Sequence, residues 1–290
     1  MDFINERKNP KSILIPTFIK ISAQVLQFFS KSLATKFATK LFITPVNFPI
    51  PKREKALYKS AQKKRLQIPA IDKEIDLISY GYSKKKVLFV HGWAGRGTQL
   101  FLTADKLLEK GYMMIAFDGP AHGKSTGKTT SLPEFVATIQ EVNAQYGPFD
   151  IAIGHSFGGL CLYNAVNEGF EVQKLITIGA ADKIEDVLLN FAASLDIKPV
   201  IGKKIKQAFD KQWNKNIDEH AASEMAKSID IPTLVIHDSC DGDVDVSCAL
   251  NIRQNLKNGE LYITNGLGHT KILRSPEVSR KIIDFIVSDV

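Results

Sequence analysis

The stretch Phe149-Asp150-Ile151-Ala152-Ile153-Gly154-His155-Ser156-Phe157-Gly158-Gly159-Leu160 decides the fold of this chain. Its apolar run, residues 149–153, indicates a buried strand, and helical character resumes at Leu160. Between them lies Gly154-x-Ser156-x-Gly158, the pattern of a tight strand-to-helix turn that lifts a serine hydroxyl out of a sheet. Glycines are needed on both sides because Cβ atoms would collide across the turn. The pattern therefore predicts that Ser156 is a nucleophile.

Short apolar runs alternate with helical segments along the rest of the chain. Such alternation predicts an α/β protein with a mostly parallel central sheet of about seven or eight strands and helices on both faces. The expected strands lie near residues 71–80, 87–90, 113–117, 149–153, 175–178, 234–237 and 261–264, and the expected helices near 100–110, 133–145, 157–168, 246–256 and 276–286.

One span interrupts this alternation. Residues 182–230 hold several helical patterns and no strand candidate, and they are too many for a simple connection. We expect them to form a helical cap insertion over the carboxyl ends of the strands, where α/β sheets bind their ligands. The core then comprises residues 67–181 and 231–290, and residues 1–66 form a separate N-terminal helical segment.

The N-terminal segment has an amphipathic and basic pattern. A helix is expected over residues 14–42 and a second, charge-rich helix over residues 53–66, after a loosely attached stretch at residues 1–12. We expect the first helix to pack on the body through an apolar face comprising Leu14, Phe18, Ile21, Val25, Phe28, Leu33, Phe37 and Leu41. The alternative is a peripheral membrane contact through residues 14–42, with the lysines toward anionic headgroups. Polar interruptions argue against a membrane span.

Charge and cysteine content limit the classes of function. Residues 1–65 carry 14 Lys/Arg and 3 Asp/Glu, a net charge of +11, whereas the remaining 24 Lys/Arg and 28 Asp/Glu give −4. Because the basic charge lies outside the body, a nucleic-acid enzyme is not indicated. Three cysteines without metal-ligand spacing indicate a reducing compartment, so we expect a cytoplasmic protein.

A serine hydroxyl needs a base and an orienting acid. His269 follows the last expected strand in a glycine-lined loop, from which it can reach the top of the sheet. Asp241 is the preferred acid because it lies four residues beyond the strand 234–237; Asp238, Asp243 and Asp182 are rivals. The four aspartates at 238–245 do not match a calcium-binding loop, because Gly242 is misplaced.

Attack on a carbonyl also requires two N–H donors for the oxyanion. The residue after the nucleophile, Phe157, supplies one backbone N–H. The loop His91-Gly92-Trp93 follows an earlier strand, so the backbone N–H of Trp93 is the expected second donor.

Two further patterns in the chain are excluded. Gly123-x-Ser125-x-Gly127 repeats the spacing around Ser156 but lies in a loop, without a strand before it or a helix directly after it. The stretch from Gly119 to Ser125 ends in Gly-Lys-Ser, as a phosphate-binding loop does. Its spacing is one residue short, and Asp118 stands where the first glycine should be.

Five motifs in this order resemble those of the α/β-hydrolase superfamily: His91-Gly92-Trp93, Phe117-Asp118-x-Pro120-x-His122-Gly123-x-Ser125, Gly154-His155-Ser156-Phe157-Gly158-Gly159, His237-Asp238-x-x-Asp241-x-x-Val244 and Gly268-His269. The resemblance implies an eight-stranded core and says little about the substrate. We expect a serine hydrolase that cleaves an acyl bond, preferably a carboxylic ester, of a small apolar substrate through an acyl-serine intermediate, with no cofactor and no metal. The alternatives are a thioester, amide or C–C bond as the target, or a non-catalytic or membrane-surface binding protein on this fold. The oligomeric state is left open.

Overall fold

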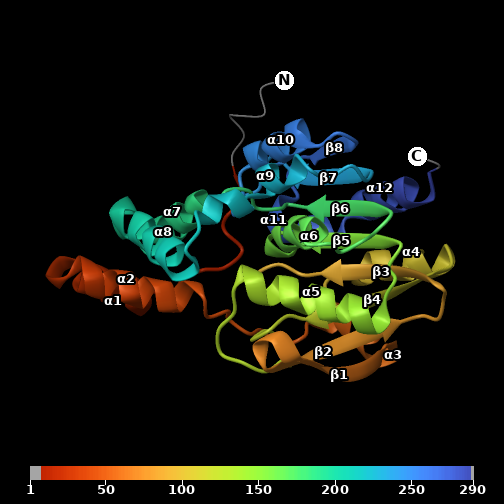
Figure 1. The fold of residues 1–290 in the computed structure, drawn as a ribbon, viewed down its shortest axis with the longest axis horizontal. Coiled ribbons are helices and arrows are strands. Elements are labelled where there is room, and N and C mark those ends of the chain that lie inside the picture. The colour runs from red at the N-terminus through yellow and green to blue at the C-terminus, as the bar shows by residue number, and fades with distance from the viewer. Residues whose placement is uncertain (1–7, 289–290) are drawn as a thin grey trace.

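The computed structural model describes residues 8–288, which form one eight-stranded sheet in the order β1-β2-β4-β3-β5-β6-β7-β8 (Figure 1). The two outer pairings, β1 with β2 and β2 with β4, are antiparallel, and the remaining strands are parallel. The predicted α/β fold with a mostly parallel sheet is confirmed. The strands are β1 Gln62–Ile68, β2 Lys73–Tyr80, β3 Lys85–Val90, β4 Tyr112–Asp118, β5 Ile151–His155, β6 Lys174–Ile178, β7 Thr233–Asp238 and β8 Gly259–Thr264.

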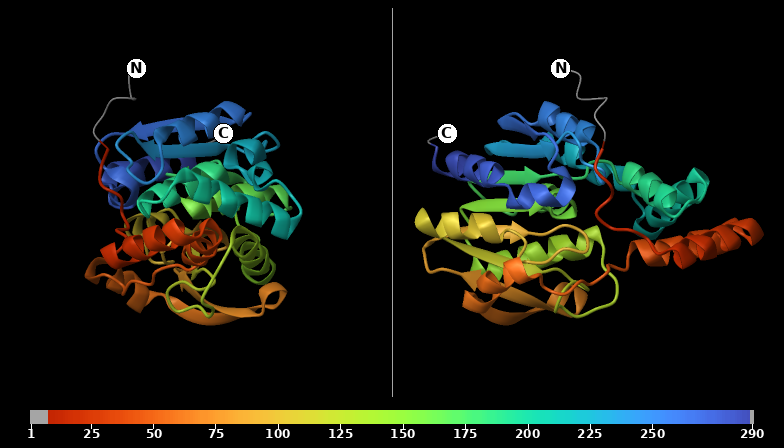
Figure 2. Two further views of the ribbon diagram at one scale, coloured as in Figure 1. Left: turned by 90° about the vertical axis from the view of Figure 1, so that its left-hand side faces the viewer. Right: turned by 180° about the vertical axis from the view of Figure 1, so that it is seen from behind.

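Helices cover both faces of this sheet, because its central strands are apolar on both sides. Alternate side chains of β3 enter opposite cores: Leu88 and Val90 lie in one cluster, Val87 and Phe89 in the other. The first face is covered by α5 Leu132–Tyr146, α6 Phe157–Asn167, α9 Ala222–Ala226 and α10 Val246–Asn255. The second is covered by α3 Lys55–Ser60, α4 Phe101–Glu109 and α12 Pro276–Val287, the latter two in front when the molecule is seen from behind (Figure 2).

Two cap helices, α7 Ile184–Ser194 and α8 Pro199–Trp213, lie beyond the carboxyl ends of the parallel strands (Figure 1). They pack on each other in a third apolar cluster around Leu188 and Ile205. The last part of the expected cap, residues 222–229, instead packs in the core, where Ala222 and Ala226 are buried beside α6 and α10. Cap and core therefore meet near residue 221.

The N-terminal segment forms a helical hairpin in place of the single helix expected over residues 14–42. Helix α1 spans Thr17–Phe29 and α2 spans Lys31–Phe42, side by side and projecting beyond the sheet next to the cap helices (Figures 1 and 2). The chain turns at Ser30, which has extended backbone angles and accepts a hydrogen bond from the Leu33 N–H. Such a serine cap begins a new helix and ends the continuous periodicity.

The hairpin packs through a different face from the one expected. Small side chains, Ala23, Ala34 and Ala38, are fully buried against the cap helices, whereas Phe18 and Phe28 are 69% and 84% exposed. Alanines permit the helix backbones to approach closely, and Ile19, Leu26 and Phe37 pack around this contact. Of the face expected to pack on the body, Phe37 and Leu41 do so, whereas the expectation is wrong for Leu14, Phe18, Ile21, Val25, Phe28 and Leu33, which are exposed.

Residues 53–66 also differ from the expected helix. Helix α3 ends at Ser60, and β1 begins at Gln62 and pairs with β2. Because β1 is an edge strand, its exposed Lys63, Lys64 and Arg65 are favourable there and are not evidence for a helix. The sheet core thus starts at residue 62, five residues before the expected boundary.

The expectation of a loosely attached stretch at residues 1–12 falls partly on residues 1–7, which lie outside the described residues. From residue 8 onward the chain contacts the body, since Asn9 N–H donates to the Cys240 carbonyl and Ser12 N–H to Asp243. Among residues 8–288, no helix combines the length and the apolar composition that crossing a bilayer requires.

Candidate active site

Ser156 lies in the turn between β5 and α6. Its backbone angles, φ 54° and ψ −120°, belong to a region that residues with a side chain rarely adopt. The flanking glycines make this turn possible. A Cβ on Gly158 would lie 2.2 Å from the Val90 carbonyl oxygen, and one on Gly154 would lie 2.7 Å from Gly159 Cα. The turn therefore has the geometry that the Gly-x-Ser-x-Gly pattern predicts.

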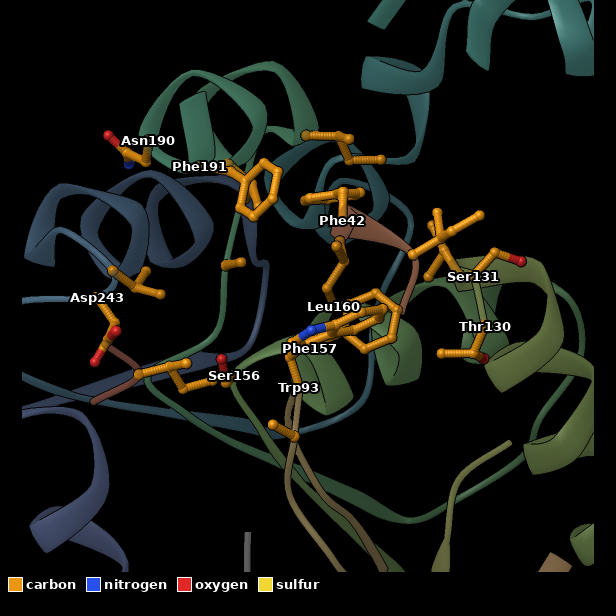
Figure 3. A pocket seen from close by; sticks show the side chains of 18 of the residues that line it. Phe42, Trp93, Thr130, Ser131, Ser156, Phe157, Leu160, Asn190, Phe191 and Asp243 are labelled. Carbon is orange, nitrogen blue, oxygen red and sulfur yellow. The ribbon is translucent and has the colours of Figure 1, made fainter. Parts of the chain in front are cut away.

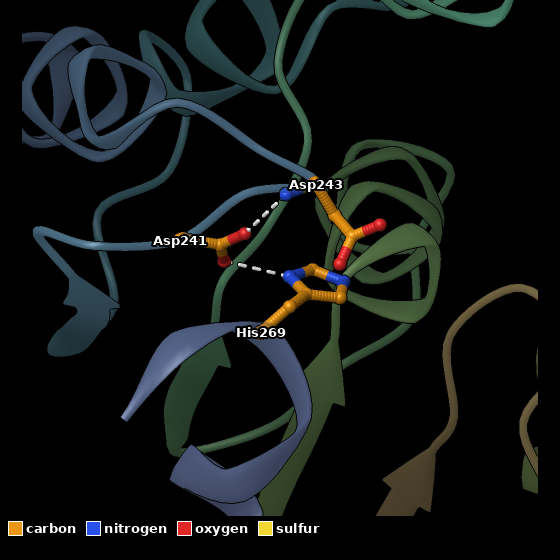
Figure 4. A group of neighbouring side chains, drawn as sticks. All are labelled: Asp241, Asp243 and His269. Atoms are coloured by element: carbon orange, nitrogen blue, oxygen red, sulfur yellow. Dashed lines mark hydrogen bonds and ion pairs between the residues drawn. The ribbon is translucent and has the colours of Figure 1, made fainter. Parts of the chain in front are cut away.

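Three distant residues meet above this turn. Ser156 Oγ lies 2.9 Å from His269 Nε2, and His269 Nδ1 lies 2.7 Å from Asp241 Oδ2 (Figure 4 shows the second of these contacts). All three side chains are almost completely buried. The structure thus brings Ser156, Asp241 and His269 into one hydrogen-bonded chain, in which the neutral imidazole can accept the hydroxyl proton.

Backbone donors hold Asp241 in place. Its Oδ1 accepts hydrogen bonds from the N–H groups of Asp243, at 2.8 Å, and Val244, at 2.9 Å, which leaves Oδ2 for His269. Burial by itself raises the pKa of Asp241, but the hydrogen bond from His269 and the charges of His269 and His237 outweigh it and lower the pKa. Asp241 is therefore ionised at neutral pH.

The pKa of His269 is shifted in the opposite direction, upward. Burial by itself lowers the pKa of His269, but the hydrogen bond and charge of Asp241, with a contribution from Asp243, raise the pKa above its ordinary value. The site therefore stabilises the imidazolium that forms when His269 takes up a proton.

The rival aspartates have other partners. Asp238 is fully buried and accepts hydrogen bonds from Thr264 Oγ1, from the N–H groups of Leu267 and Gly268 in the loop that carries His269, and from the Cys240 N–H. Asp182 accepts from the Ser223 N–H, at the start of α9. Asp238 thus supports the loop before His269. Its role was not identified from the sequence, although its position at the end of β7 was the available signal.

Asp243 lies beside the imidazole without a hydrogen bond to it (Figure 4). Oxygen and nitrogen atoms of Asp241, Asp243 and His269 come within 4.8 Å of one another, close enough to hold a metal ion. Both oxygens of Asp241 already accept hydrogen bonds, and the Asp243 carboxylate accepts one from the Ser12 N–H. Donors of the protein therefore already meet the hydrogen-bonding needs of these carboxylate oxygens, as a proton relay requires.

The loop after β3 approaches Ser156 closely. A Cβ on Gly92 would lie 2.7 Å from Ser156 Cβ, so only glycine fits there. Within residues 8–288, the backbone N–H groups of Trp93 and Phe157 donate to no other protein atom. Both expected oxyanion donors are therefore free to bind a substrate oxygen.

Two buried histidines brace this loop, a role that was not predicted. His91 Nε2 accepts from the Gly119 N–H at 2.8 Å, and His122 Nε2 accepts from the Ala94 N–H at 3.0 Å. Burial lowers the pKa of His91 to about 4 and that of His122 to about 3, so both rings are neutral acceptors.

Ser125, in the second Gly-x-Ser-x-Gly match, is far from this chemistry. Its hydroxyl donates to the Asp118 carbonyl and accepts from the Asp76 N–H, so it fastens a loop to β2. The exclusion of Ser125 as nucleophile agrees with these contacts.

Ser156 opens into a cavity of about 1070 Å³ between the core, the cap and the N-terminal hairpin. Figure 3 shows Trp93, Phe157 and Leu160 close to Ser156, with Phe191 of α7 and Phe42 of α2 on the side of the cap and the hairpin. Phe42 stacks on Trp93 with ring centroids 6.1 Å apart. The hairpin is thus part of the pocket wall, also through Ile15 and Ile19, which the sequence alone did not indicate.

Comparisons with known proteins agree with this architecture. Residues 87–224 match the model of the alpha/beta hydrolase family. A non-heme haloperoxidase from Rhodococcus erythropolis is 25% identical, with 71% of this chain and 93% of that protein covered, and the AB hydrolase superfamily protein YisY from Bacillus subtilis (strain 168) is 24% identical, with 69% and 90% covered. An esterase structure from Exiguobacterium antarcticum superimposes with a TM-score of 0.61 at 21% identity, with 78% of this chain and 100% of that chain covered. With the eight-stranded sheet and the turn around Ser156, these matches show that the chain has the α/β-hydrolase fold and that its residues 87–224 are similar to the alpha/beta hydrolase family.

Proposed function

We propose that this protein is a serine hydrolase that cleaves a carboxylic ester of a small apolar substrate through an acyl-serine intermediate. The observation that carries the proposal is the hydrogen-bonded chain Ser156–His269–Asp241, whose hydroxyl end opens into an apolar cavity. The names of an esterase among the structural neighbours and of a hydrolase superfamily protein among the relatives support the same reaction class.

In this reaction His269 takes the proton of Ser156 as Oγ attacks the ester carbonyl carbon. The N–H groups of Trp93 and Phe157 bind the oxyanion, and each such donor contributes about 3 kcal/mol to the barrier reduction. Collapse of the tetrahedral intermediate expels the alcohol, which receives the proton from His269. Water then attacks the acyl-serine while His269 takes up its proton, and His269 returns that proton to Ser156 Oγ as the bond to the acyl carbon breaks and the carboxylic acid leaves. Asp241 stays ionised and orients the imidazole throughout.

The lining of the cavity indicates that the substrate is apolar, but it does not indicate which type of bond is cleaved. Aromatic and aliphatic side chains, among them Phe191, Phe209 and Trp213 of the cap, line it, so an apolar acyl chain is the expected occupant. Thioesters, amides and activated C–C bonds use the same three side chains and remain the alternatives to an ester.

The test is Ser156→Ala, with Ser125→Ala as the matched control because it lies in the same sequence pattern. We expect Ser156→Ala to lower kcat for p-nitrophenyl esters about 10⁴-fold or more with little change in KM, and Ser125→Ala to stay within a few-fold of wild type. A fluorophosphonate probe should label the wild type and Ser125→Ala only. An ester panel from acetate to palmitate then defines the acyl chain.

The competing class is a non-catalytic binding protein on the same fold. Absence of probe labelling, or turnover by Ser156→Ala close to that of wild type, would rule out the proposed hydrolase and favour this reading.

A further inference from the structure

Helix α1 presents an apolar stripe to solvent. Phe18, Ile21, Val25, Phe28 and Phe29 recur at helical spacing within an arc of roughly 100°, and they are 69%, 54%, 49%, 84% and 77% exposed. Leu33, 51% exposed, continues the apolar surface just beyond the turn into α2. We call these six residues the hairpin stripe. Exposed apolar surface of this continuity indicates an interaction site.

The stripe faces away from the body of the protein. On another side of α1, Lys20 pairs with Asp196, and Gln27 accepts from the Lys198 N–H, in the loop between the cap helices. A third side, with Ala23 buried, packs in the cluster shared with α2 and the cap. Both packing sides of α1 are therefore occupied, and the stripe has no partner among residues 8–288.

The charges around the stripe indicate what covers it. Residues 11–42 contain five lysines and no aspartate or glutamate. Lys11 and Lys20 contact the cap, whereas Lys31, Lys36 and Lys40 of α2 are exposed and form no ion pair within the described part of the chain. Aromatic side chains beside free lysines match the apolar boundary and the negative headgroups of an anionic bilayer.

We propose that the protein docks on anionic phospholipid bilayers through the hairpin stripe, with Lys31, Lys36 and Lys40 toward the headgroups. A second copy of this chain fits the stripe less well, because a symmetric pairing brings two sets of uncompensated lysines together. A nucleic acid would engage the lysines but leave the phenylalanines in water. The bound hairpin lies directly beside the cavity, since Ile19 and Phe42 of the same helices line it.

The experiment is co-sedimentation of the full-length protein with sucrose-loaded vesicles of phosphatidylcholine alone or with one third phosphatidylglycerol, at low and high salt. We expect binding to the anionic vesicles that weakens with salt. Phe28→Ser/Phe29→Ser should reduce the partition coefficient about tenfold or more, and Lys31→Gln/Lys36→Gln/Lys40→Gln should reduce it by about fivefold for each lysine removed.

Matched controls remove equivalent groups elsewhere. Tyr82→Ser removes an aromatic side chain that is 86% exposed, and Lys55→Gln/Lys59→Gln/Lys84→Gln removes three exposed lysines from α3 and the β2–β3 turn. Both should bind vesicles as wild type does. None of the substituted residues, Phe28, Phe29, Lys31, Lys36 and Lys40, lines the cavity, so both hairpin variants should retain wild-type turnover of a soluble short-chain ester.

Ser156→Ala should bind vesicles normally, which separates docking from catalysis. Absence of binding to anionic vesicles, or binding that neither hairpin variant weakens, would overturn the proposal. So would a dimer in sedimentation velocity that the phenylalanine variant dissociates, or binding of duplex DNA without binding of vesicles.

Discussion

His269 differs from the other buried histidines near the site in its direct hydrogen bond to a carboxylate. Burial lowers the pKa of His91, His122 and His155 to about 4, 3 and 3 respectively, and it lowers the pKa of His237 although Asp241 lies 3.6 Å away. His269 is equally enclosed, but two carboxylates face it and its pKa is raised. Desolvation acts on all of these rings, so the direct hydrogen bond to Asp241, together with the charges of Asp241 and Asp243, makes His269 the ring that can accept a proton near neutral pH.

Asp243→Asn tests this electrostatic contribution. The neutral form of His269 is required for attack, so kcat/KM falls as pH decreases through the raised pKa of His269. Removing the charge of Asp243 destabilises the imidazolium and lowers that pKa, so the acid limb of the kcat/KM profile should move to lower pH. Asp245→Asn, two residues away and paired with Lys8, is the control and should leave the limb in place. If the acid limb of the kcat/KM profile does not move in Asp243→Asn, the charge of Asp243 does not contribute to the pKa of His269.

At the scale of the elements, the site depends on the loops that follow strands. Asp238 lies at the end of β7. Its carboxylate accepts hydrogen bonds from one hydroxyl group and from three backbone N–H groups. Two of those donors, Leu267 and Gly268, directly precede His269. The β7 and β8 ends are thereby fixed to each other, which holds the imidazole within hydrogen-bonding distance of Ser156.

Asp238→Asn should loosen this junction. An amide group supplies one acceptor oxygen and turns two N–H donors toward groups that are themselves donors, which leaves buried polar groups unpaired. We expect the free energy of unfolding to fall by about 1–3 kcal/mol and kcat to fall about tenfold, because His269 is less well placed. Urea denaturation and ester turnover measure the two effects; a variant as stable and active as wild type would contradict the role of this junction.

At the scale of the whole molecule, the N-terminal segment is fastened to the core after it leaves the hairpin. The Ile43 carbonyl accepts from the Thr130 N–H, and Asn47 bonds to the loop at residues 121–123. Glu54 is 2% exposed and accepts from Arg96 Nη1 at 3.1 Å and from Thr98 Oγ1 at 2.8 Å. Arg96 lies three residues beyond Trp93, so this buried pair joins the segment to the loop after β3.

Glu54→Met tests the buried pair. The substitution leaves the Arg96 guanidinium buried without its counter-ion, and removing one partner of such a pair costs about 3–5 kcal/mol. We expect a loss of that size in urea denaturation. The double variant Glu54→Met/Arg96→Met removes both charges and should recover most of the stability. If the double variant is no more stable than the single one, the pair is not the origin of the loss.

The sequence by itself determined the parts of this protein that local patterns encode. Short apolar runs gave the six later strands nearly at their observed bounds, and Gly154, Ser156 and Gly158 gave the turn, because its steric requirement is local. The order of loops along the chain was enough to nominate Asp241 and His269, which the structure brings to Ser156.

Only the tertiary structure decided the rest. Lys63 to Arg65 became an edge strand because β2 was available to pair with it. The apolar stripe of α1 faces solvent because α1 and α2 pack on each other and on the cap helices around three alanines on another side. The hairpin became a wall of the cavity because Phe42 reaches Trp93. In each case the outcome depends on which residues of another segment form the second half of the contact. A local sequence pattern describes only the first half.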